Sequence, residues 1–321
     1  MLKLTGRRKN IKNLHRGAIS PCAEIKGDRM RRVLCIIIIV IVLAAGVFLT
    51  IYPYLYNAYT EKHHSEVMDN YTRAVETISQ GDIDSIKKSV NEYNSSLLNE
   101  SVVLTDPFDP NAFKNHDSDT YAELLNIDGD GTIAILDVPK INIKLPVYHG
   151  TTDEILSDSL GHLEGTSMPI GGTGTHCVIT GHTGLPNVKL FTDLTELETG
   201  DVFYIDVLNE ILAYEIDNIA IVEPEDTELL GISRDKDYVT LLTCYPYGIN
   251  SHRLLVRGAR VPYEEAVEQE KNMEGTGGSS QWNREYLKTV AICGAGYGSV
   301  FLIFFIVKRR KKKKEKEMEK E

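Results

Sequence analysis

The sequence predicts a mainly β protein, a closed β-barrel of about eight strands with short helices, an N-terminal helical pair and two flanking transmembrane helices. Three observations lead to this fold class. Short apolar runs separated by turn residues crowd the region 126–263. Apolar residues recur at helical spacing over 53–100. Two long apolar runs, 33–52 and 287–307, flank both regions.

Charge is distributed unevenly along the 321 residues, whose net charge is −11. Residues 1–32 carry ten Lys and Arg against two acids, and residues 308–321 carry nine against four. The body between them, residues 33–307, holds 16 basic and 40 acidic residues, a net of −24. A nucleic-acid partner requires a basic face, so this acidic body excludes that class of partner.

Each apolar run is close to the ~20 residues that span a bilayer. Arg31 and Arg32 precede the first run, and the basic run 308–314 follows the second. The positive-inside rule therefore predicts a multi-pass membrane protein with cytoplasmic termini and an extracellular domain. A cleaved signal peptide is the alternative for the first run, but its apolar core exceeds the usual length of about 7–15 residues. A buried core helix is the alternative for the second, and the adjoining basic run argues against it.

These features divide the chain into eight parts. In order they are a cytoplasmic basic N-terminus 1–32, a transmembrane anchor 33–52, a helical region 53–100, a loop 101–113, a β-barrel 126–263, a linker 264–285, a transmembrane helix 287–307 and a cytoplasmic basic tail 308–321. Gly81 and Asp82 break the helical region into two helices, with Asp82 the expected N-cap of the second. The linker is polar and rich in Gly and Ser.

Eight segments within the barrel region are predicted to be strands, because they are short, apolar and bounded by turn residues. They are Thr132–Val138, Ile141–Val147, His176–Thr180, Val202–Val207, Ile211–Ile216, Ile219–Val222, Tyr238–Thr243 and Arg253–Arg257. A helical turn at Asp153–Ser159 and a short segment near Val188–Leu194 are expected to interrupt them. So many short strands indicate a closed antiparallel or mixed barrel.

A thiol and a guanidinium are expected at one end of this barrel. Cys244 ends the strand 238–243 and Arg253 begins the strand 253–257, with loop-forming residues between them. If the two strands pair, both side chains face the same loop, and a nearby cation favours the nucleophilic thiolate. A buried strand-end cysteine beside a surface arginine is the simpler alternative.

A nucleophilic thiol also needs a group that transfers protons, and His182 is the candidate. It follows the apolar strand that ends at Thr180, and the glycines at 181 and 184 free the backbone on both sides of it. A strand-end histidine could meet a strand-end cysteine across the mouth of a barrel. A polar surface histidine is the more ordinary interpretation.

Two further arrangements of the external cysteines and histidines compete with a catalytic site. Cys177 and Cys244 could form one disulfide. His176, Cys177, His182 and Cys244 could hold zinc in a non-enzymatic metal-binding domain. However, His176 and Cys177 are adjacent and should point to opposite faces of their strand, which argues against the zinc site.

The loop 101–113 contains two Asp-Pro pairs, which disfavour regular structure, together with Phe108 and Phe113. A solvated loop does not ordinarily carry two phenylalanines. This loop therefore either packs back on the body of the domain or covers a site.

Several motifs resemble the sortase transpeptidases. They are Thr180-Gly-His-Thr-Gly-Leu-Pro186, the run from Leu242 to Gly258, Leu145-Pro-Val-Tyr-His-Gly150 and Gly161-His-Leu-Glu-Gly-Thr-Ser167. The two membrane spans, the acidic domain and Asp106-Pro-Phe108 are similar to class C, the branch that builds pili. The resemblance covers roughly 55–262.

The resemblance implies a sortase-like barrel with Cys244 as nucleophile, His182 as general acid and base, and Arg253 as the cation for the oxyanion or substrate. It implies that the loop 101–113 is a lid bearing Asp106, Pro107 and Phe108, with Asp106 near Arg253 and Phe108 over Cys244. No cofactor and no metal are expected.

The resemblance also implies the substrate and its acceptor. An LPxTG-type sorting signal is cleaved between Thr and Gly through a thioester, and the acyl group passes to a lysine amine of a pilin subunit. The implied location is the cell membrane of a Gram-positive bacterium. Anchoring of surface proteins to a cell-wall precursor remains the alternative role.

Overall fold

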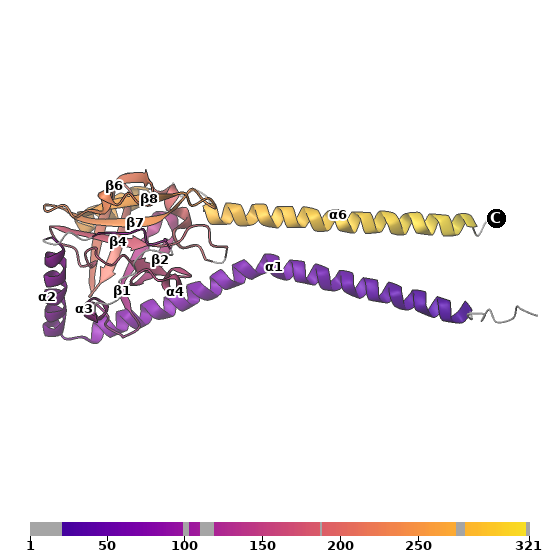
Figure 1. Ribbon diagram of the computed structural model, residues 1–321, viewed down its shortest axis with the longest axis horizontal. Helices are drawn as coiled ribbons and strands as arrows, with labels where there is room; N and C mark the ends of the chain where they lie inside the picture. The colour runs from indigo at the N-terminus through magenta and orange to yellow at the C-terminus, as the bar shows by residue number, and fades with distance from the viewer. Residues whose placement is uncertain (1–20, 99–102, 110–118, 187, 274–279, 319–321) are drawn as a thin grey trace, which may run out of the picture. The chain divides into compact units, whose positions relative to one another are not determined.

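The computed structural model describes residues 21–98, 103–109, 119–186, 188–273 and 280–318 (Figure 1). The chain divides into two compact units, residues 1–49 and residues 50–321. The described part of the first unit belongs to helix α1 (Pro21–Thr77), whose remainder lies in the second unit. The second unit contains every strand and the candidate site.

Eight strands close into a barrel in the order β1-β2-β3-β4-β7-β8-β6-β5, as the sequence predicted. The pairs β2–β3 and β4–β7 are parallel, and the other pairs are antiparallel. The strands are β1 (Thr132–Val138), β2 (Ile143–His149), β3 (Leu160–His162), β4 (Thr175–Thr180), β5 (Val202–Val207), β6 (Glu210–Val222), β7 (Asp237–Tyr245) and β8 (His252–Val261). Short helices join them, namely η1 (Pro139–Ile141), α4 (Asp153–Leu156), η2 (Leu190–Glu196) and η3 (Glu228–Leu230).

The strand prediction was wrong in two places. One strand was predicted as two and another was missed, so the predicted and observed numbers of strands still agree. The segments Ile211–Ile216 and Ile219–Val222 form one strand, β6, with an irregularity in register between Ile216 and Asn218. This irregularity interrupts the alternation of apolar residues, so two polar residues in the middle of a strand resemble a turn. The strand β3 was missed because three residues are too few to show a period of two.

The barrel interior is a continuous apolar core. Phe203 and Tyr214 stack inside it with ring centroids 5.5 Å apart. Gly258 of β8 packs directly against them, since a Cβ at this position would lie 2.5 Å from a ring carbon of Phe203. A core packed this closely keeps the strand ends in fixed positions.

The helical pair packs against the outside of this barrel. The Tyr71 hydroxyl of α1 donates to the carbonyl of Ile133 at 3.0 Å. The next helix, α2 (Gln80–Leu97), is held by Asn94, whose side-chain amide bonds both the N–H and the carbonyl of Met168. A short helix, α3 (Asp119–Glu123), follows.

The prediction that Asp82 caps α2 was wrong. The N-cap is Ser79, whose hydroxyl oxygen accepts from the backbone N–H of Asp82 and donates to the Asp82 carboxylate. Serine has an extended backbone here, and its shorter side chain reaches the free N–H groups of the first turn. Asp82 therefore lies three residues beyond the cap, inside the first turn, where its negative charge is favourable.

The predicted linker 264–285 contains a helix, α5 (Tyr263–Met273). Its Ala266 is fully buried in a cluster with Val202 and Tyr204, and the Tyr204 hydroxyl donates to Glu270 at 2.8 Å. The polar composition suggested a linker, but Glu, Ala, Gln and Lys are also good helix formers. The Gly-rich part of the segment, 274–279, lies outside the described residues.

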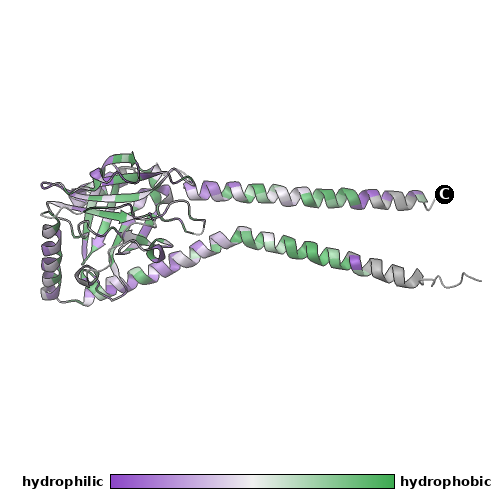
Figure 2. Ribbon diagram, viewed as in Figure 1, coloured by the Kyte–Doolittle hydropathy of each residue, from purple (hydrophilic) through white to green (hydrophobic). Residues whose placement is uncertain are grey.

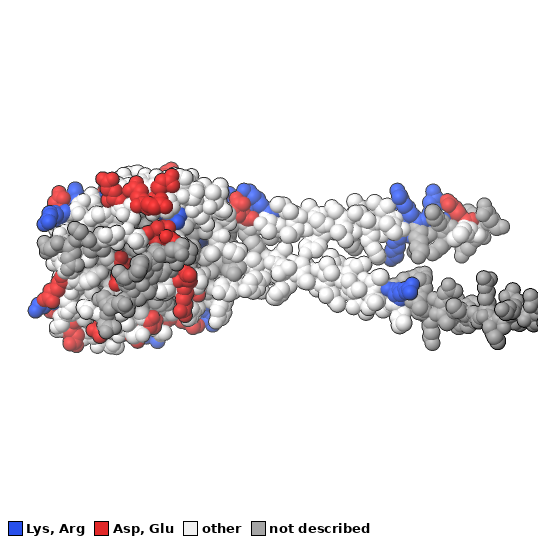
Figure 3. Space-filling model, in the orientation of Figure 1, with Lys and Arg blue, Asp and Glu red and all other residues white. Residues whose placement is uncertain are grey.

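Two described helices are apolar and long enough to span a membrane, over Val33–Thr77 of α1 and Gln281–Arg310 of α6 (Gln281–Met318). The hydropathy colouring marks their apolar stretches in green (Figure 2), and the side chains of these stretches are exposed. In α6, basic residues follow the apolar stretch directly (Figure 3). The two helices are consistent with membrane anchoring. The N-terminal residues 1–20 and the end of the basic tail, 319–321, lie outside the described residues.

His162 of β3 is the centre of a buried polar network beside the barrel. Its Nε2 lies 3.0 Å from the carbonyl of Ser167, which can only accept, so this nitrogen carries the proton. Its Nδ1 then accepts from the Tyr121 hydroxyl at 2.8 Å. Burial lowers the pKa of His162 to about 4, so the ring is neutral in the folded protein. The network joins α3 to the barrel.

This network predicts that the protein loses stability in acid. The pKa of His162 is about 4 when folded and 6.5 when unfolded, so the unfolded chain binds more protons between these values. The contribution of His162 is fully present above pH 6.5 and is lost as the pH falls toward 4, a loss of about 3 kcal/mol. Thermal unfolding of the full chain in detergent micelles, measured from pH 7 to 4, should therefore show a falling Tm.

The variant His162→Gln cannot titrate at this position, and its Tm should depend less steeply on pH than that of the unchanged chain. The exposed His63 offers a matched control, and His63→Gln should keep the original slope. Equal slopes for the unchanged chain and His162→Gln would contradict the assignment.

Candidate active site

The pairing of β7 with β8 places Cys244 directly opposite Arg253. Directly opposed residues of antiparallel strands project their side chains to the same face of the sheet. Both side chains are almost completely covered, with Cys244 6% and Arg253 8% exposed. A buried thiol and a buried guanidinium therefore share one face at the end of the barrel.

His182 lies at the same edge because β4 runs parallel to β7, so the carboxyl ends of both strands point the same way. Just beyond β4, Gly181 donates its N–H to the Leu242 carbonyl at 3.2 Å. The Thr243 hydroxyl donates to the Gly181 carbonyl at 2.7 Å. His182 is thus held beside the residue that precedes Cys244, and the structure brings the three candidate residues to one edge.

The loop 101–113 covers this edge in its described part, Val103–Asp109. The Asp106 carboxylate accepts from Nε and Nη2 of Arg253 at 2.8 and 2.6 Å. The Phe108 ring lies 5.0 Å from the His182 ring, and the Arg253 guanidinium carbon lies 5.4 Å from the Phe108 centroid. Pro107 between them is buried. Phe113 lies outside the described residues.

An apolar floor supports the loop. Leu104 and Phe108 pack on it, and it consists of Leu163, Val178, Leu230, Leu242 and Leu255. Ala220 and Val222 of β6 adjoin it. These residues come from the outer face of the barrel and from η3. Removing the loop would uncover an apolar surface that leads to the Cys244 edge.

The covered site holds its thiol in the neutral form. Burial raises the pKa of Cys244 to about 11, although the Arg253 charge acts in the opposite direction. Asp106 adds to the rise because its negative charge opposes a thiolate. Burial lowers the pKa of Arg253, but the hydrogen bond to Asp106 and the nearby charges of Cys244, Asp106 and Glu225 outweigh it and leave that pKa raised. The loop thus neutralises the cation that would otherwise favour the thiolate.

The disulfide between Cys177 and Cys244 does not fit the geometry. Both cysteines are free. Cys177 pairs with Val239, five residues before Cys244 on β7, which separates the two by about 16 Å along the strand, well beyond disulfide reach.

The zinc arrangement does not fit His176, because both of its ring nitrogens form hydrogen bonds within the protein and neither is available for a metal. Nδ1 donates to the Gly231 carbonyl at 2.9 Å, so Nε2 accepts from the Thr240 hydroxyl at 2.7 Å. The neighbouring Cys177 points instead into the barrel core. These two residues therefore do not join His182 and Cys244 in one cluster.

Comparisons with known proteins show the family of this chain. The family profile described as "Sortase domain" matches residues 136–261. Sortase C-1 of Streptococcus pneumoniae is 45% identical with a TM-score of 0.58, and the match covers 62% of this chain and 99% of that one. The chain belongs to the sortase family.

Other sortases are also similar to this chain. "Sortase C1 of GBS Pilus Island 1" is 41% identical with a TM-score of 0.55, and the match covers 60% of this chain and 89% of that one. Sortase D of Bacillus subtilis (strain 168) is 32% identical over 130 residues, which are 40% of this chain. The chain spans 63% of the length of that sortase D. Sortases are cysteine transpeptidases, and both of these solved structures are sortases of class C.

One part of the site was not found from the sequence. The helix η2 supports the His182 loop through Phe191, whose N–H donates to the His182 carbonyl at 3.1 Å. Phe191 is fully buried. In the sequence it is an apolar residue of a short segment, and nothing marks it as a neighbour of the candidate histidine.

The contacts of Asp106 and Phe108 predict that these two residues suppress the reactivity of the thiol. In the double variant Asp106→Ala, Phe108→Ala, the pKa of Cys244 should fall below about 11, because both the burial and the opposing charge are reduced. Each unit of that fall raises the thiolate fraction about tenfold, so alkylation at pH 8 should accelerate roughly tenfold or more.

The rate is measured with iodoacetamide on the full chain, and Cys244→Ala supplies the background from the other cysteines. Val103 lies on the same loop but is 86% exposed, so Val103→Ala is the matched control and should leave the rate unchanged. An unaltered rate in the double variant would show that these contacts do not govern the thiol.

Proposed function

We propose that this protein is a membrane-anchored sortase that cleaves an LPxTG-type sorting signal between Thr and Gly and transfers the acyl group to a lysine amine of a pilin subunit. The observation that carries the proposal is the cross-strand pair of Cys244 and Arg253 with His182 at the same barrel edge. Family membership supports it, and so do the solved sortases of class C.

In the first half-reaction the Cys244 thiolate attacks the carbonyl carbon of the signal's threonine. The guanidinium of Arg253 stabilises the negative charge that develops on the carbonyl oxygen. His182, as imidazolium, protonates the glycine nitrogen as the C–N bond breaks. The products are an acyl thioester on Cys244 and a free amine that departs.

In the second half-reaction a lysine amine of the acceptor replaces the thiol. The neutral His182 accepts a proton as the amine attacks the thioester carbon, and the Cys244 thiolate leaves. An isopeptide bond results. Water would give hydrolysis instead, so the apolar floor that supports the loop favours transfer by limiting access of water.

The loop Val103–Asp109 acts as a lid in this proposal. Asp106 occupies two donors of Arg253, and Phe108 lies against His182. A substrate carbonyl could not reach the guanidinium while these contacts persist. The lid must therefore open before acylation, and the resting enzyme is inhibited by its own chain.

The two apolar helices orient the enzyme. On this proposal both termini lie in the cytoplasm and the barrel lies outside a Gram-positive cell membrane, and the basic residues beside each apolar run support that orientation. The barrel thereby faces the surface proteins that carry sorting signals.

Anchoring to a cell-wall precursor is the second candidate, because some curated relatives are sortase A enzymes. These are 28% and 26% identical, for Bacillus anthracis and Streptococcus agalactiae. The identities of 41% and 45% to sortases C favour the pilus role.

A transfer assay tests the proposal. The full chain carrying Asp106→Ala, Phe108→Ala, in detergent micelles, should join an LPxTG peptide to a lysine-bearing pilin domain with loss of the residues after threonine. Mass spectrometry of the product identifies the bond. Replacing the acceptor lysine by arginine should abolish the product, because the guanidinium is a poor nucleophile.

Adding Cys244→Ala should reduce transfer to the background rate. Transfer that persists in that chain would refute the nucleophile. Preference for a peptidoglycan-precursor amine over the pilin lysine would favour wall anchoring.

A further inference from the structure

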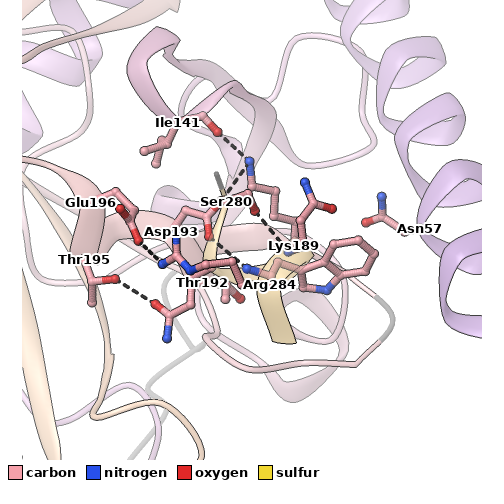
Figure 4. A network of polar contacts seen from close by, with 12 residues as sticks. Asn57, Ile141, Lys189, Thr192, Asp193, Thr195, Glu196, Ser280 and Arg284 are labelled. Atoms are coloured by element: carbon pink, nitrogen blue, oxygen red, sulfur yellow. Dashed lines mark hydrogen bonds and ion pairs between the residues drawn. The ribbon is translucent and has the colours of Figure 1, made fainter. Parts of the chain in front are cut away.

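The start of the second membrane helix is joined to the barrel by a polar network (Figure 4). The backbone N–H of Trp282 donates to the Asp193 carboxylate at 3.2 Å. Arg284 forms an ion pair with Glu196 at 2.6 Å, and Thr195 donates to Gln281 at 2.8 Å. The first turn of α6 thus contacts polar residues along most of η2.

An apolar contact accompanies these bonds. Trp282 is only 7% exposed, although it lies one residue inside the helix start. Its ring stacks on Tyr286 with the centroids 5.6 Å apart and the planes 4° from parallel. The first turn of α6 is therefore a packed part of the catalytic unit.

Asp193 is the centre of the network. Its carboxylate is buried and receives both the Trp282 N–H and the Lys189 ammonium, the latter at 3.1 Å. The ammonium also donates to the carbonyl of Ile141. The Ser280 hydroxyl accepts from the Asn283 N–H at 3.4 Å, and Asp193 caps the Trp282 N–H of the same first turn from a different segment of the chain.

The other side of η2 holds the His182 loop. Phe191 donates its N–H to the His182 carbonyl at 3.1 Å, and the Thr192 hydroxyl accepts from the Gly184 N–H at 3.1 Å. The Phe191 ring also packs on Gly181, where an added Cβ would lie 3.0 Å from a ring carbon. Contacts on both sides of His182 therefore originate in η2.

The helix η2 needs support from outside itself. It is a short 3-10 helix, a form with poor hydrogen-bond geometry, and it contains a kink at Phe191. Leu190 before the kink has a φ of 34°, a conformation that costs energy for a residue with a side chain. The bonds from Lys189 and from α6 hold this strained turn in place.

We propose that the first turn of α6 positions the catalytic histidine through Asp193 and Arg284, so that the second membrane helix is a positioning element of the active site. Neither residue touches the substrate or the thiol, and both act through η2. The inference rests on the proposed role of His182, and it predicts that a change in the first turn of α6 impairs His182 without altering the chemistry of Cys244.

The test uses the full chain in detergent micelles, with Asp106→Ala, Phe108→Ala as the parent so that the thiol is accessible. Arg284→Ala and Asp193→Ala should each lower kcat for peptide transfer about tenfold with little change in KM, because small misplacements of a catalytic group are costly. The iodoacetamide rate at Cys244 should stay the same. Arg284→Lys and Asp193→Asn, which keep the charge or the cap, should recover part of kcat.

Lys288 supplies the matched control, since it lies one turn further along α6 and pairs with Glu285 of the same helix. Lys288→Ala should leave kcat unchanged. A second measurement does not depend on activity, namely the NMR signal of the ¹³C-labelled His182 ring, assigned with His182→Gln. That signal should shift in Arg284→Ala and Asp193→Ala but not in Lys288→Ala.

Unchanged kcat and an unshifted ring signal in both alanine variants would overturn the inference. So would a fall in kcat matched by an equal fall in the alkylation rate, because that would indicate general disruption of the domain. A parent chain without transferase activity would refute the proposed function alone, and the ring signal would still decide whether α6 positions His182.

Discussion

The antiparallel register of β7 and β8 is the constraint on which the rest of the site depends. It sets Cys244 opposite Arg253 within one buried face, and the parallel pairing of β4 with β7 adds His182 at the same edge. A shift by one residue would turn the thiol to the other face of the sheet. The packed barrel core fixes this register. The relative positions of Cys244, Arg253 and His182 therefore depend on apolar contacts inside the barrel.

In the proposed mechanism the guanidinium of Arg253 takes part both in the resting state and in catalysis. Paired with Asp106, Arg253 is neutralised and the thiol remains protonated. Released from Asp106, it becomes free to stabilise a thiolate or an oxyanion. In the proposed mechanism this one ion pair, 9–10% exposed at its two side chains, both protects the thiol and controls access of the substrate. Burial strengthens such a pair and makes its separation a costly step.

The three residues of the candidate site were named from the sequence, and the structure brings them to one edge of the barrel. Cys244 and Arg253 lie at the ends of apolar runs and His182 lies two residues past the end of another, but the resemblance to the sortases, not this pattern alone, singled them out. The strand β3 was missed because three residues show no period, and β6 was divided because a bulge breaks alternation. The contacts between η2 and α6 join residues almost 90 positions apart, such as Asp193 and Trp282. Contacts of this kind depend on tertiary packing, which no local pattern records.

Intact-mass spectrometry of the full chain during reaction would detect the acyl-enzyme itself. The chain with Asp106→Ala, Phe108→Ala is mixed briefly with an LPxTG peptide and no acceptor, then acidified. We expect an added mass equal to the peptide up to threonine, located on Cys244 and released by hydroxylamine, with less in the unchanged chain. An adduct on another residue, or none in either chain, would refute Cys244 as the nucleophile of a lidded transpeptidase.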